Sequence, residues 1–164
     1  MRRPCLFLDR DGVINQPAKP GEYINSWSEF RFLPNAADWI RLFNAAGYLV
    51  IVVTNQRGVA LGKTQAADLD EIHREMVAGL AAVGARVDDV FCCPHHAGVC
   101  DCRKPKPGLI EQACRKWDID LPHSILVGDT EADAELARNC GVRFVLATGQ
   151  GNVYPPFEAQ EGAA

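Results

Sequence analysis

The sequence lacks any apolar run long enough to cross a membrane. No stretch of its 164 residues approaches the roughly 20 consecutive apolar residues that a membrane-spanning helix needs. The first residues, Met1-Arg2-Arg3-Pro4, are basic, but the apolar run that follows them stops at Asp9, so no signal peptide is expected. We therefore expect a cytoplasmic protein that does not associate with a membrane.

An excess of positive charge is also missing. The chain has 17 Lys and Arg residues against 21 Asp and Glu residues, which gives a formal net charge of −4. Neither a nucleic acid nor an anionic membrane surface attracts a net acidic protein. The chain has no basic helix and no stacking run of aromatic residues either, so a nucleic-acid-binding module is not expected.

Internal repeats, low-complexity tracts and a convincing linker are absent as well. A chain of 164 residues fits one domain and can bury roughly 70% of the surface that its unfolded chain exposes. We therefore expect one domain over residues 1–164, with a short tail from about residue 152 that contains Pro155 and Pro156. A small domain of this kind is expected to be a monomer.

Short apolar runs that alternate with helical patterns are present, and they predict an α/β fold. The predicted strands are Cys5–Leu8, Leu49–Val53, Val90–Cys92, Ile125–Val127 and Phe144–Leu146. The predicted helices are Asn35–Ala46, a segment with Thr64 as its N-cap, Pro107–Trp117 and Glu131–Cys140. This alternation predicts a doubly wound, Rossmann-like, mostly parallel sheet with helices on both faces.

Polar residues follow three of the predicted strands. They are Asp9 to Asp11 after the first strand, Thr54 to Gln56 after the second, and Gly128-Asp129 after the fourth. The carboxyl ends of parallel strands form one edge of the sheet, where such folds bind ligands, so one shared site is expected. Asn55 and Gln56 would either contact a ligand there or only satisfy backbone groups of the loop.

Asp9 and Asp11 stand two residues apart. In extended backbone both side chains point into one site while Arg10 points away. An isolated Asp-x-Asp-Gly segment is equally typical of a surface turn and of a functional site. Asp129 and Asp133 supply further carboxylates at another strand end. Asp129 and Asp9 together make an oxygen-rich site that suits Mg²⁺. The alternative for Asp129 is to cap the following helix.

A magnesium site beside a spare carboxylate predicts phosphoryl transfer. Asp9 would attack phosphorus and form an aspartyl-phosphate, since the metal and nearby cations reduce the repulsion between the two anions. Asp11 would protonate the leaving alkoxide and then activate the water that hydrolyses the intermediate. The hydroxyl of Thr54 and the ammonium group of Lys104 suit the phosphate oxygens, where charge develops.

The seven cysteines are an odd number, so they cannot all pair within one chain. Four of them lie between residues 92 and 102 together with two histidines, a pattern that indicates metal before disulfides in an intracellular chain. The predicted ligands of a closed tetrahedral zinc site are Cys93, His95, Cys100 and Cys102, with Cys92 and His96 as possible replacements for their neighbours. Structural zinc would then hold the following segment, residues 103–107, over the phosphate site.

Four motifs carry a resemblance to a known family: DRDGVIN, VVTNQRGVALGK, CPHHAGVCDCRKPKPGLI and VGDTEAD. They resemble the motifs of haloacid-dehalogenase-superfamily phosphatases, and more narrowly those of the heptose-bisphosphate and histidinol-phosphate phosphatases. The resemblance covers about residues 4–151. It implies a Rossmann-like fold with a zinc-binding loop and without a large cap domain.

The resemblance also implies roles for individual residues. Asp9 would be the nucleophile and Asp11 the acid/base, with Mg²⁺ held by Asp9, the Asp11 backbone carbonyl and Asp129. Thr54 and Lys104 would stabilise the phosphoryl group. Further implied residues are Arg103 for substrate recognition and Cys93, His95, Cys100 and Cys102 as zinc ligands.

The two phosphatase branches differ in substrate. The segment GEYIN, which contains the candidate substrate contact Tyr23, favours the heptose branch, as do NQRGVALGK, KPGLI and Thr148-Gly149. The expected substrate is therefore a sugar phosphate, D-glycero-D-manno-heptose 1,7-bisphosphate, which would lose its 7-phosphate. Two features depart from the heptose branch. Only four residues separate His95 from Cys100, which favours histidinol phosphate. Leu61 stands where an arginine is expected, which weakens the expectation of sugar-phosphate contacts there.

A non-enzymatic alternative is a receiver-like signalling domain, which also carries Mg²⁺ and a phosphorylated aspartate in a doubly wound sheet. Such a domain does not need an acid/base two residues after the phosphorylated aspartate, and no zinc loop is expected in it. Asp11 and the cysteine–histidine cluster therefore favour the enzyme.

Overall fold

Five parallel strands form one sheet at the centre of the structure, a computed structural model that describes residues 1–147. The strands are β1 (Cys5–Leu8), β2 (Leu49–Asn55), β3 (Asp89–Cys93), β4 (Ile125–Gly128) and β5 (Arg143–Leu146). They lie in the order β3-β2-β1-β4-β5, and each strand is parallel to its neighbours. The predicted parallel sheet is confirmed, and β2 continues two residues beyond the predicted end.

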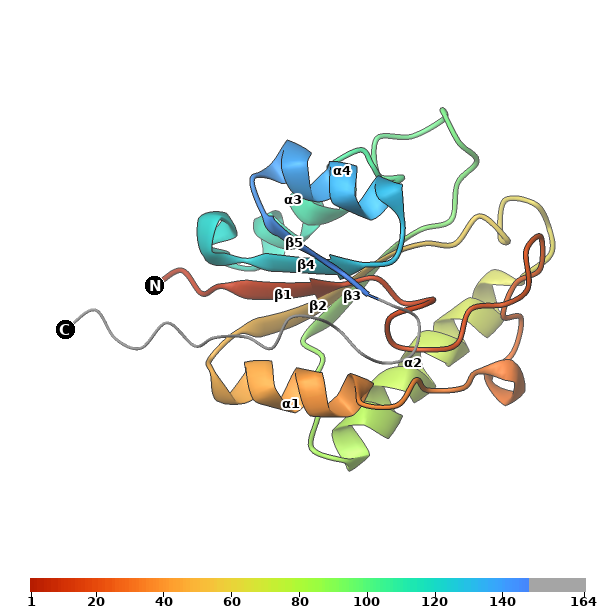
Figure 1. The fold of residues 1–164 in the computed structure, drawn as a ribbon. Coiled ribbons are helices and arrows are strands. Elements are labelled where there is room, and N and C mark those ends of the chain that lie inside the picture. The colour runs from red at the N-terminus through yellow and green to blue at the C-terminus, as the bar shows by residue number, and fades with distance from the viewer. Residues whose placement is uncertain (148–164) are drawn as a thin grey trace.

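Helices cover both faces of this sheet. The helices are α1 (Ala36–Ala45), α2 (Ala66–Ala82), α3 (Gly108–Lys116) and α4 (Glu131–Cys140), with short 3-10 helices at Trp27–Glu29 and Leu121–His123. Figure 1 shows α1 and α2 below the sheet and α3 and α4 above it. The fold is therefore the doubly wound arrangement that the sequence predicts.

The central strands β1, β2 and β4 are apolar over most of their length because both faces of the sheet are buried there. Successive side chains of a strand point to opposite faces. Leu6 and Leu8 of β1 accordingly belong to the apolar core beneath α1 and α2, whereas Cys5 and Phe7 belong to the core beneath α3 and α4. These two cores fix the sheet, so the loops at its carboxyl edge start from well-defined positions.

The N-cap of α2 differs from the sequence prediction. Helix α2 begins at Ala66 with Gln65 as its N-cap, so the assignment of Thr64 as the cap is wrong by one residue. The Thr64 hydroxyl instead donates to the side-chain oxygen of Asn25 at 2.7 Å, which joins two loops.

Thr130, and not Asp129, is the N-cap of α4. Its hydroxyl accepts a hydrogen bond from the backbone N–H of Asp133, and the Asp133 carboxylate accepts one from the backbone N–H of Thr130. This reciprocal pair is a capping box with aspartate in place of the more common glutamate or glutamine. The capping alternative for Asp129 is therefore wrong, and the Asp129 carboxylate is left for another use.

The order of the strands creates a crevice at the carboxyl edge of the sheet. The chain passes from the central β1 outward to β3 and then crosses to β4 on the other side of β1. The loops that follow β1 and β4 consequently diverge, and ligands bind at such a switch point in open α/β sheets. Asp9 follows β1 and Asp129 follows β4, so both lie at this point.

Nothing large covers that edge within residues 1–147. The long segment between β1 and α1 contains only the 3-10 helix Trp27–Glu29, and the described helices all pack on the sheet (Figure 1), so the prediction of a fold without a large cap is confirmed. The described helices are each too short or too polar to cross a bilayer. The predicted tail from about residue 152 and the pair Thr148-Gly149 lie outside the described residues.

Candidate active site

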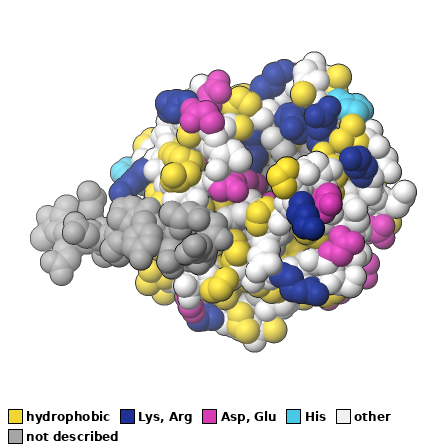
Figure 2. Space-filling model, turned by 45° about the vertical axis from the view of Figure 1, so that its right-hand side comes forward, with side chains coloured by type: hydrophobic (Ala, Val, Ile, Leu, Met, Phe, Trp, Pro, Cys, Tyr) yellow, Lys and Arg dark blue, Asp and Glu magenta, His cyan; other side chains and the backbone are white. Residues whose placement is uncertain are grey.

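A cavity of about 350 Å³ opens at the carboxyl edge of the sheet. Its lining residues come from the end of β2, from the loops after β1, β3 and β4, and from the start of α4: Asp9, Asp11, Pro17, Asn55, Arg103, Lys104, Asp129, Thr130 and Ala132. Figure 2 turns this edge toward the viewer and shows acidic side chains near the middle of the face, with Lys and Arg side chains around them. Six residues singled out from the sequence thus line one cavity.

Three carboxylates meet at the floor of this site. Oxygens of Asp9, Asp129 and Asp133 all lie within 4.8 Å of one another, close enough to bind a single metal ion. Carboxylate oxygen is the donor that Mg²⁺ prefers, so the donor set fits the predicted ion. Gly12 makes the arrangement possible, because a Cβ atom at this position would overlap the Asp129 carboxylate.

Lys104 supplies positive charge to these carboxylates from a buried position. Its Nζ atom lies 3.0 Å from Oδ1 of Asp9 and 2.7 Å from Oδ1 of Asp133, and it also donates to the Val53 carbonyl at 3.0 Å. Burial acts to lower the pKa of Lys104, but the two neighbouring carboxylates outweigh burial and raise it. The side chain is therefore a fixed cation beside Asp9.

Asn55 holds Lys104 in place. The backbone N–H of Lys104 donates to Oδ1 of Asn55 at 3.0 Å, and Nδ2 of Asn55 donates back to the Lys104 carbonyl at 3.2 Å. Asn55 also lines the cavity. Of the two alternatives from the sequence, the contact with loop backbone is therefore present, and the position at the cavity leaves the contact with a ligand open.

Two of these carboxylates, Asp9 and Asp129, have raised pKa values. Burial raises the pKa of Asp9 to about 7, and Asp133 and Asp11 add to this effect while Lys104 opposes it. Burial and the charge of Asp133 likewise raise the pKa of Asp129. A divalent cation between these carboxylates would remove the repulsion, so the site has the electrostatic character of a cation site.

Asp11 occupies a different environment from Asp9. Its Oδ1 accepts hydrogen bonds from Nη2 of Arg10 and Nδ2 of Asn15, each at 2.9 Å, and its Oδ2 accepts one from Nε2 of Gln56 at 2.9 Å. Burial would raise the pKa of Asp11, but the Arg10 charge and these hydrogen bonds lower it. Asp11 is therefore held as an oriented carboxylate.

The prediction that Arg10 points away from the site is wrong. The backbone turns directly after Asp9, with the N–H groups of Ile14 and Asn15 donating to the Arg10 carbonyl at 2.8 and 3.3 Å. Alternation between two faces requires extended backbone, which ends here. The Arg10 side chain is fully buried and folds back so that its guanidinium group contacts Asp11.

Thr54, Gln56 and Tyr23 lie outside the described lining of the cavity. Thr54 is buried at the end of β2, and its hydroxyl oxygen accepts a hydrogen bond from Nε2 of Gln56 at 2.9 Å, which leaves its O–H free to donate. The ring centre of Tyr23 lies 5.7 Å from Nζ of Lys63. Gln56 therefore bridges Thr54 and Asp11, and Tyr23 contacts the loop that precedes α2.

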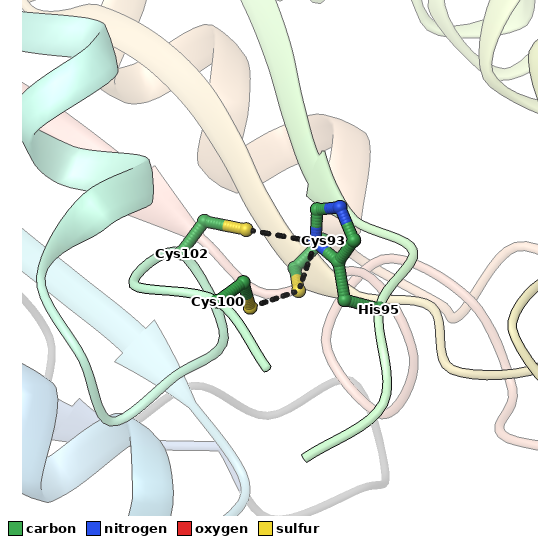
Figure 3. Close-up of side chains that lie close together, drawn as sticks. All are labelled: Cys93, His95, Cys100 and Cys102. Carbon is green, nitrogen blue, oxygen red and sulfur yellow. Dashed lines mark hydrogen bonds between the residues drawn. The ribbon is translucent and has the colours of Figure 1, made fainter. Parts of the chain in front are cut away.

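The predicted zinc ligands form a second cluster, which Figure 3 shows with all four side chains pointing toward one another. Sγ of Cys93 lies 3.5 Å from Nδ1 of His95 and 3.6 Å from Sγ of Cys100, and Nδ1 of His95 lies 3.2 Å from Sγ of Cys102. All four donor atoms lie within 4.8 Å of one another. Three sulfurs and one imidazole nitrogen are a donor set that fits tetrahedral zinc.

This cluster is joined directly to the cavity. Lys104, which contacts Asp9, stands two residues after Cys102 in the sequence. On the same loop, Nζ of Lys106 donates to the Cys100 carbonyl at 2.9 Å. The two alternative ligands proposed from the sequence, Cys92 and His96, lie outside the four-residue cluster.

Sequence reasoning missed two contributors to this site, Asn15 and His73. Asn15 stands four residues after Asp11 and bonds to it through the turn, so the DxDGxxN spacing was an available signal. His73 lies on α2, with Nε2 3.1 Å from Nη1 of Arg10. Only the packing of α2 brings His73 there, and nothing in the local sequence indicates it.

Comparisons with known proteins agree with this geometry. Residues 101–154 match the HAD-hydrolase-like family. The chain is 42% identical over 149 residues to the D-glycero-beta-D-manno-heptose-1,7-bisphosphate 7-phosphatase of Rhodopseudomonas palustris, covering 86% of this chain and 81% of the relative. It is 44% identical over 137 residues to the D-glycero-alpha-D-manno-heptose-1,7-bisphosphate 7-phosphatase of Mycobacterium bovis, covering 82% of this chain and 72% of the relative.

A solved structure has the same fold. The crystal structure of D,D-heptose 1,7-bisphosphate phosphatase from B. bronchiseptica, complexed with magnesium and phosphate, superposes with a TM-score of 0.82. The two sequences are 37% identical, and the match covers 90% of this chain and 83% of the other. The likeness therefore extends over nearly the whole chain.

Proposed function

The chain belongs to the D-glycero-D-manno-heptose-1,7-bisphosphate 7-phosphatase family of haloacid-dehalogenase-like hydrolases, and from this premise we propose that it removes the 7-phosphate of that heptose bisphosphate. One observation carries the proposal beyond the family likeness. A candidate nucleophile, Asp9, shares the floor of an open cavity with two further carboxylates and with the buried cation of Lys104.

In the first proposed step a carboxylate oxygen of Asp9 attacks phosphorus, and the bond from phosphorus to the sugar oxygen breaks. Magnesium, held by Asp9, the Asp11 carbonyl and Asp129, would offset the charge between the two anions. Lys104 and the free O–H of Thr54 would stabilise the phosphoryl oxygens. The lowered pKa of Asp11 leaves its carboxylate ionised in the free enzyme. Asp11 therefore takes a proton from the substrate phosphate and passes it to the leaving oxygen.

In the second proposed step Asp11 takes a proton from water, and the resulting hydroxide attacks phosphorus. Inorganic phosphate leaves, the Asp9 carboxylate is restored, and Asp11 releases its proton to solvent before the next turnover. The lowered pKa of Asp11 suits this step, since a base must be ionised to accept the proton. The three donors that surround Asp11 would keep it oriented in both steps.

Arg103 is the proposed contact for the rest of the substrate, with Asn55, Gln56 and Tyr23 as further candidates. Its Nη1 atom is buried and has no hydrogen-bond partner among residues 1–147, while the side chain lines the cavity. A buried donor without a partner is unfavourable unless a ligand satisfies it. A substrate oxygen beside Arg103 would supply that acceptor.

We propose zinc, held by Cys93, His95, Cys100 and Cys102, as a structural ion that keeps the Arg103-Lys104 segment at the cavity. We also propose that the protein works as one domain and as a monomer in the cytoplasm, on a small dissolved substrate. Its seven cysteines are all free, which is typical of a reducing compartment.

The direct test is phosphate release, with Mg²⁺ present, from both anomers of the heptose bisphosphate and from histidinol phosphate. We expect turnover of at least one heptose anomer at a kcat/KM well above that for histidinol phosphate. Activity confined to histidinol phosphate would overturn the proposal that the heptose bisphosphate is the substrate. A phosphorylated protein that persists instead of releasing phosphate would support the receiver-like alternative.

The role of Asp9 has its own test. Asp9→Asn keeps the size of the side chain but removes the nucleophilic charge, so turnover should vanish while the circular dichroism spectrum stays unchanged. Substantial residual activity in a folded Asp9→Asn protein would show that Asp9 is not the nucleophile.

A further inference from the structure

A chain of three side chains connects helix α2 with the site: His73, Arg10 and Asp11. Nη1 of Arg10 lies 3.1 Å from Nε2 of His73, and Nη2 of Arg10 donates to both Asp11 oxygens at 2.9 and 3.3 Å. A guanidinium group has only donors, so Nε2 of His73 accepts and the proton of the neutral ring is on Nδ1. His73 is therefore an uncharged acceptor that holds the far side of the guanidinium group.

Arg10 sits where an arginine is unfavourable for stability alone. Its side chain is fully buried, the centre of its guanidinium group lies 5.9 Å from the Phe30 ring centre, and its Nε atom has no hydrogen-bond partner within residues 1–147. A buried charge with an unsatisfied donor destabilises a fold relative to a well-packed apolar side chain. The arrangement therefore favours a role in the site over a role in stability.

The geometry at Asp11 indicates what that role is. Arg10 contacts both carboxylate oxygens, while Asn15 and Gln56 contact one each. Nη2 of Arg10 alone reaches both oxygens, so the orientation of the planar guanidinium group limits the rotation of the carboxylate. The guanidinium group can do so only if its own rotation is fixed, and the His73 contact lies on its other terminal nitrogen.

We propose that Arg10 and His73 are positioning residues for Asp11, which keep its carboxylate at the angle from which it reaches the leaving oxygen. This inference rests on the proposed function, because it takes Asp11 as the acid/base. Neither side chain lines the described cavity, and the one contact of Arg10 with Asp9, from its backbone N–H to Oδ1 at 2.8 Å, is kept in a side-chain substitution. Their effect on the reaction therefore passes through Asp11.

The test compares His73→Leu, which removes the acceptor, with His73→Gln, whose side-chain oxygen can accept from Arg10. Each variant is assayed as the metal-loaded enzyme on two substrates. One is an alkyl phosphate, the heptose bisphosphate, whose leaving oxygen needs a proton. The other is p-nitrophenyl phosphate, whose leaving group departs without one; acetyl phosphate replaces it if its turnover is too slow to measure.

We expect kcat/KM on the alkyl phosphate to fall about tenfold in His73→Leu, as a modest displacement of a catalytic group does. On p-nitrophenyl phosphate kcat/KM should change less than about twofold, since proton donation by Asp11 contributes little there. His73→Gln should restore most of the alkyl phosphate activity. The concentration of Mg²⁺ for half-maximal activity should stay constant, because Asp9 and Asp129 are not disturbed.

A loss of nucleophile, metal or overall packing would lower kcat/KM on both substrates alike, and this outcome would overturn the proposal. Wild-type alkyl phosphate activity in His73→Leu would overturn it as well. His123→Leu, at an exposed histidine on the 3-10 helix Leu121–His123, is the matched control and should leave both activities unchanged.

Arg10→Lys gives an independent measurement, since lysine keeps the charge but not the planar fork. We expect it to reproduce the selective loss on the alkyl phosphate; if it does not fold, the His73 variants decide alone. Should the wild-type enzyme release no phosphate from the heptose bisphosphate, the proposed substrate fails. The same comparison then uses histidinol phosphate as the alkyl phosphate and still tests whether Arg10 and His73 position Asp11.

Discussion

The ammonium group of Lys104 lies 2.7 Å from the carboxylate of Asp133, and both side chains are almost completely buried. Asp133 comes from the first turn of α4, where its carboxylate also accepts hydrogen bonds from the backbone N–H and the hydroxyl of Thr130. Lys104 comes from the loop that follows the cysteine cluster. This contact therefore links the start of α4 to the loop that carries the cation beside Asp9.

Removing the charge of Asp133 should destabilise the protein strongly. Asp133→Ala leaves Lys104 with one carboxylate fewer and removes the capping box of α4, so we expect a loss of about 3–5 kcal/mol in the free energy of unfolding. Urea denaturation measures this loss. Glu131→Gln on the same helix breaks the exposed pair with Arg138 and should change stability by less than about 0.5 kcal/mol. Equal effects of the two substitutions would contradict the contribution assigned to the buried pair.

Gly12→Ala should weaken magnesium activation. Gly12 has a φ of +83°, and a Cβ atom there would overlap the Asp129 carboxylate. The substitution combines backbone strain of about 1–2 kcal/mol with displacement of a proposed metal ligand. Gly47→Ala is the matched control, because Gly47 has nearly the same φ of +84° but no atoms near the site of a Cβ.

Both glycine variants should lose similar stability from the backbone, whereas only Gly12→Ala should need more Mg²⁺ for half-maximal activity. The readout is the magnesium dependence of phosphate release together with urea denaturation. Identical magnesium dependence in Gly12→Ala and the wild-type protein would show that Asp129 does not need its present position.

Loss of one zinc ligand should act on substrate binding. Cys100→Ser should remove bound zinc, loosen the loop that carries Arg103 and Lys104, and raise KM by about tenfold. Cys92→Ser is the matched control, since Cys92 is a neighbouring thiol outside the four-residue cluster. Elemental analysis gives the zinc content and steady-state kinetics gives KM. A zinc-free protein with wild-type kinetics would refute the link between the loop and the cavity.

Acid should destabilise the protein in part through His73. Burial and the Arg10 charge lower the pKa of His73 from 6.5 to about 4. The unfolded chain then binds more protons than the folded protein between these values, so the contribution of neutral His73 is complete above pH 6.5 and is lost as the pH falls toward 4. The loss is on the order of 2 kcal/mol after allowance for partial contact with solvent.

Comparison with His73→Gln isolates this contribution, because glutamine does not titrate. The difference in unfolding free energy between the wild-type protein and His73→Gln should shrink as the pH is lowered from 6.5 to 4. Urea denaturation at several pH values measures it. Parallel pH profiles for the two proteins would mean that His73 is protonated as readily in the folded chain as in the unfolded one.

Most of the fold could be predicted from local patterns. The strand Cys5–Leu8 and the helix Glu131–Cys140 have their predicted ends, because an apolar run and a glycine stop signal specify them locally. The start of α2 was misplaced by one residue, since Thr64 and Gln65 are both compatible with the same turn and the Thr64 hydroxyl is engaged by Asn25 from a distant loop.

The residue types and their positions along the chain specify the chemistry that the site can use. Three cysteines and a histidine on one short segment have the spacing of metal ligands, which is a local property, and Asp9 and Asp129 each directly follow an apolar run. The orientation of those groups depends on long-range packing. Arg10 turned inward because the backbone leaves the extended conformation after Asp9. Its partner His73 reaches it only because α2 packs beneath the sheet, and a contact across 63 residues leaves no local pattern.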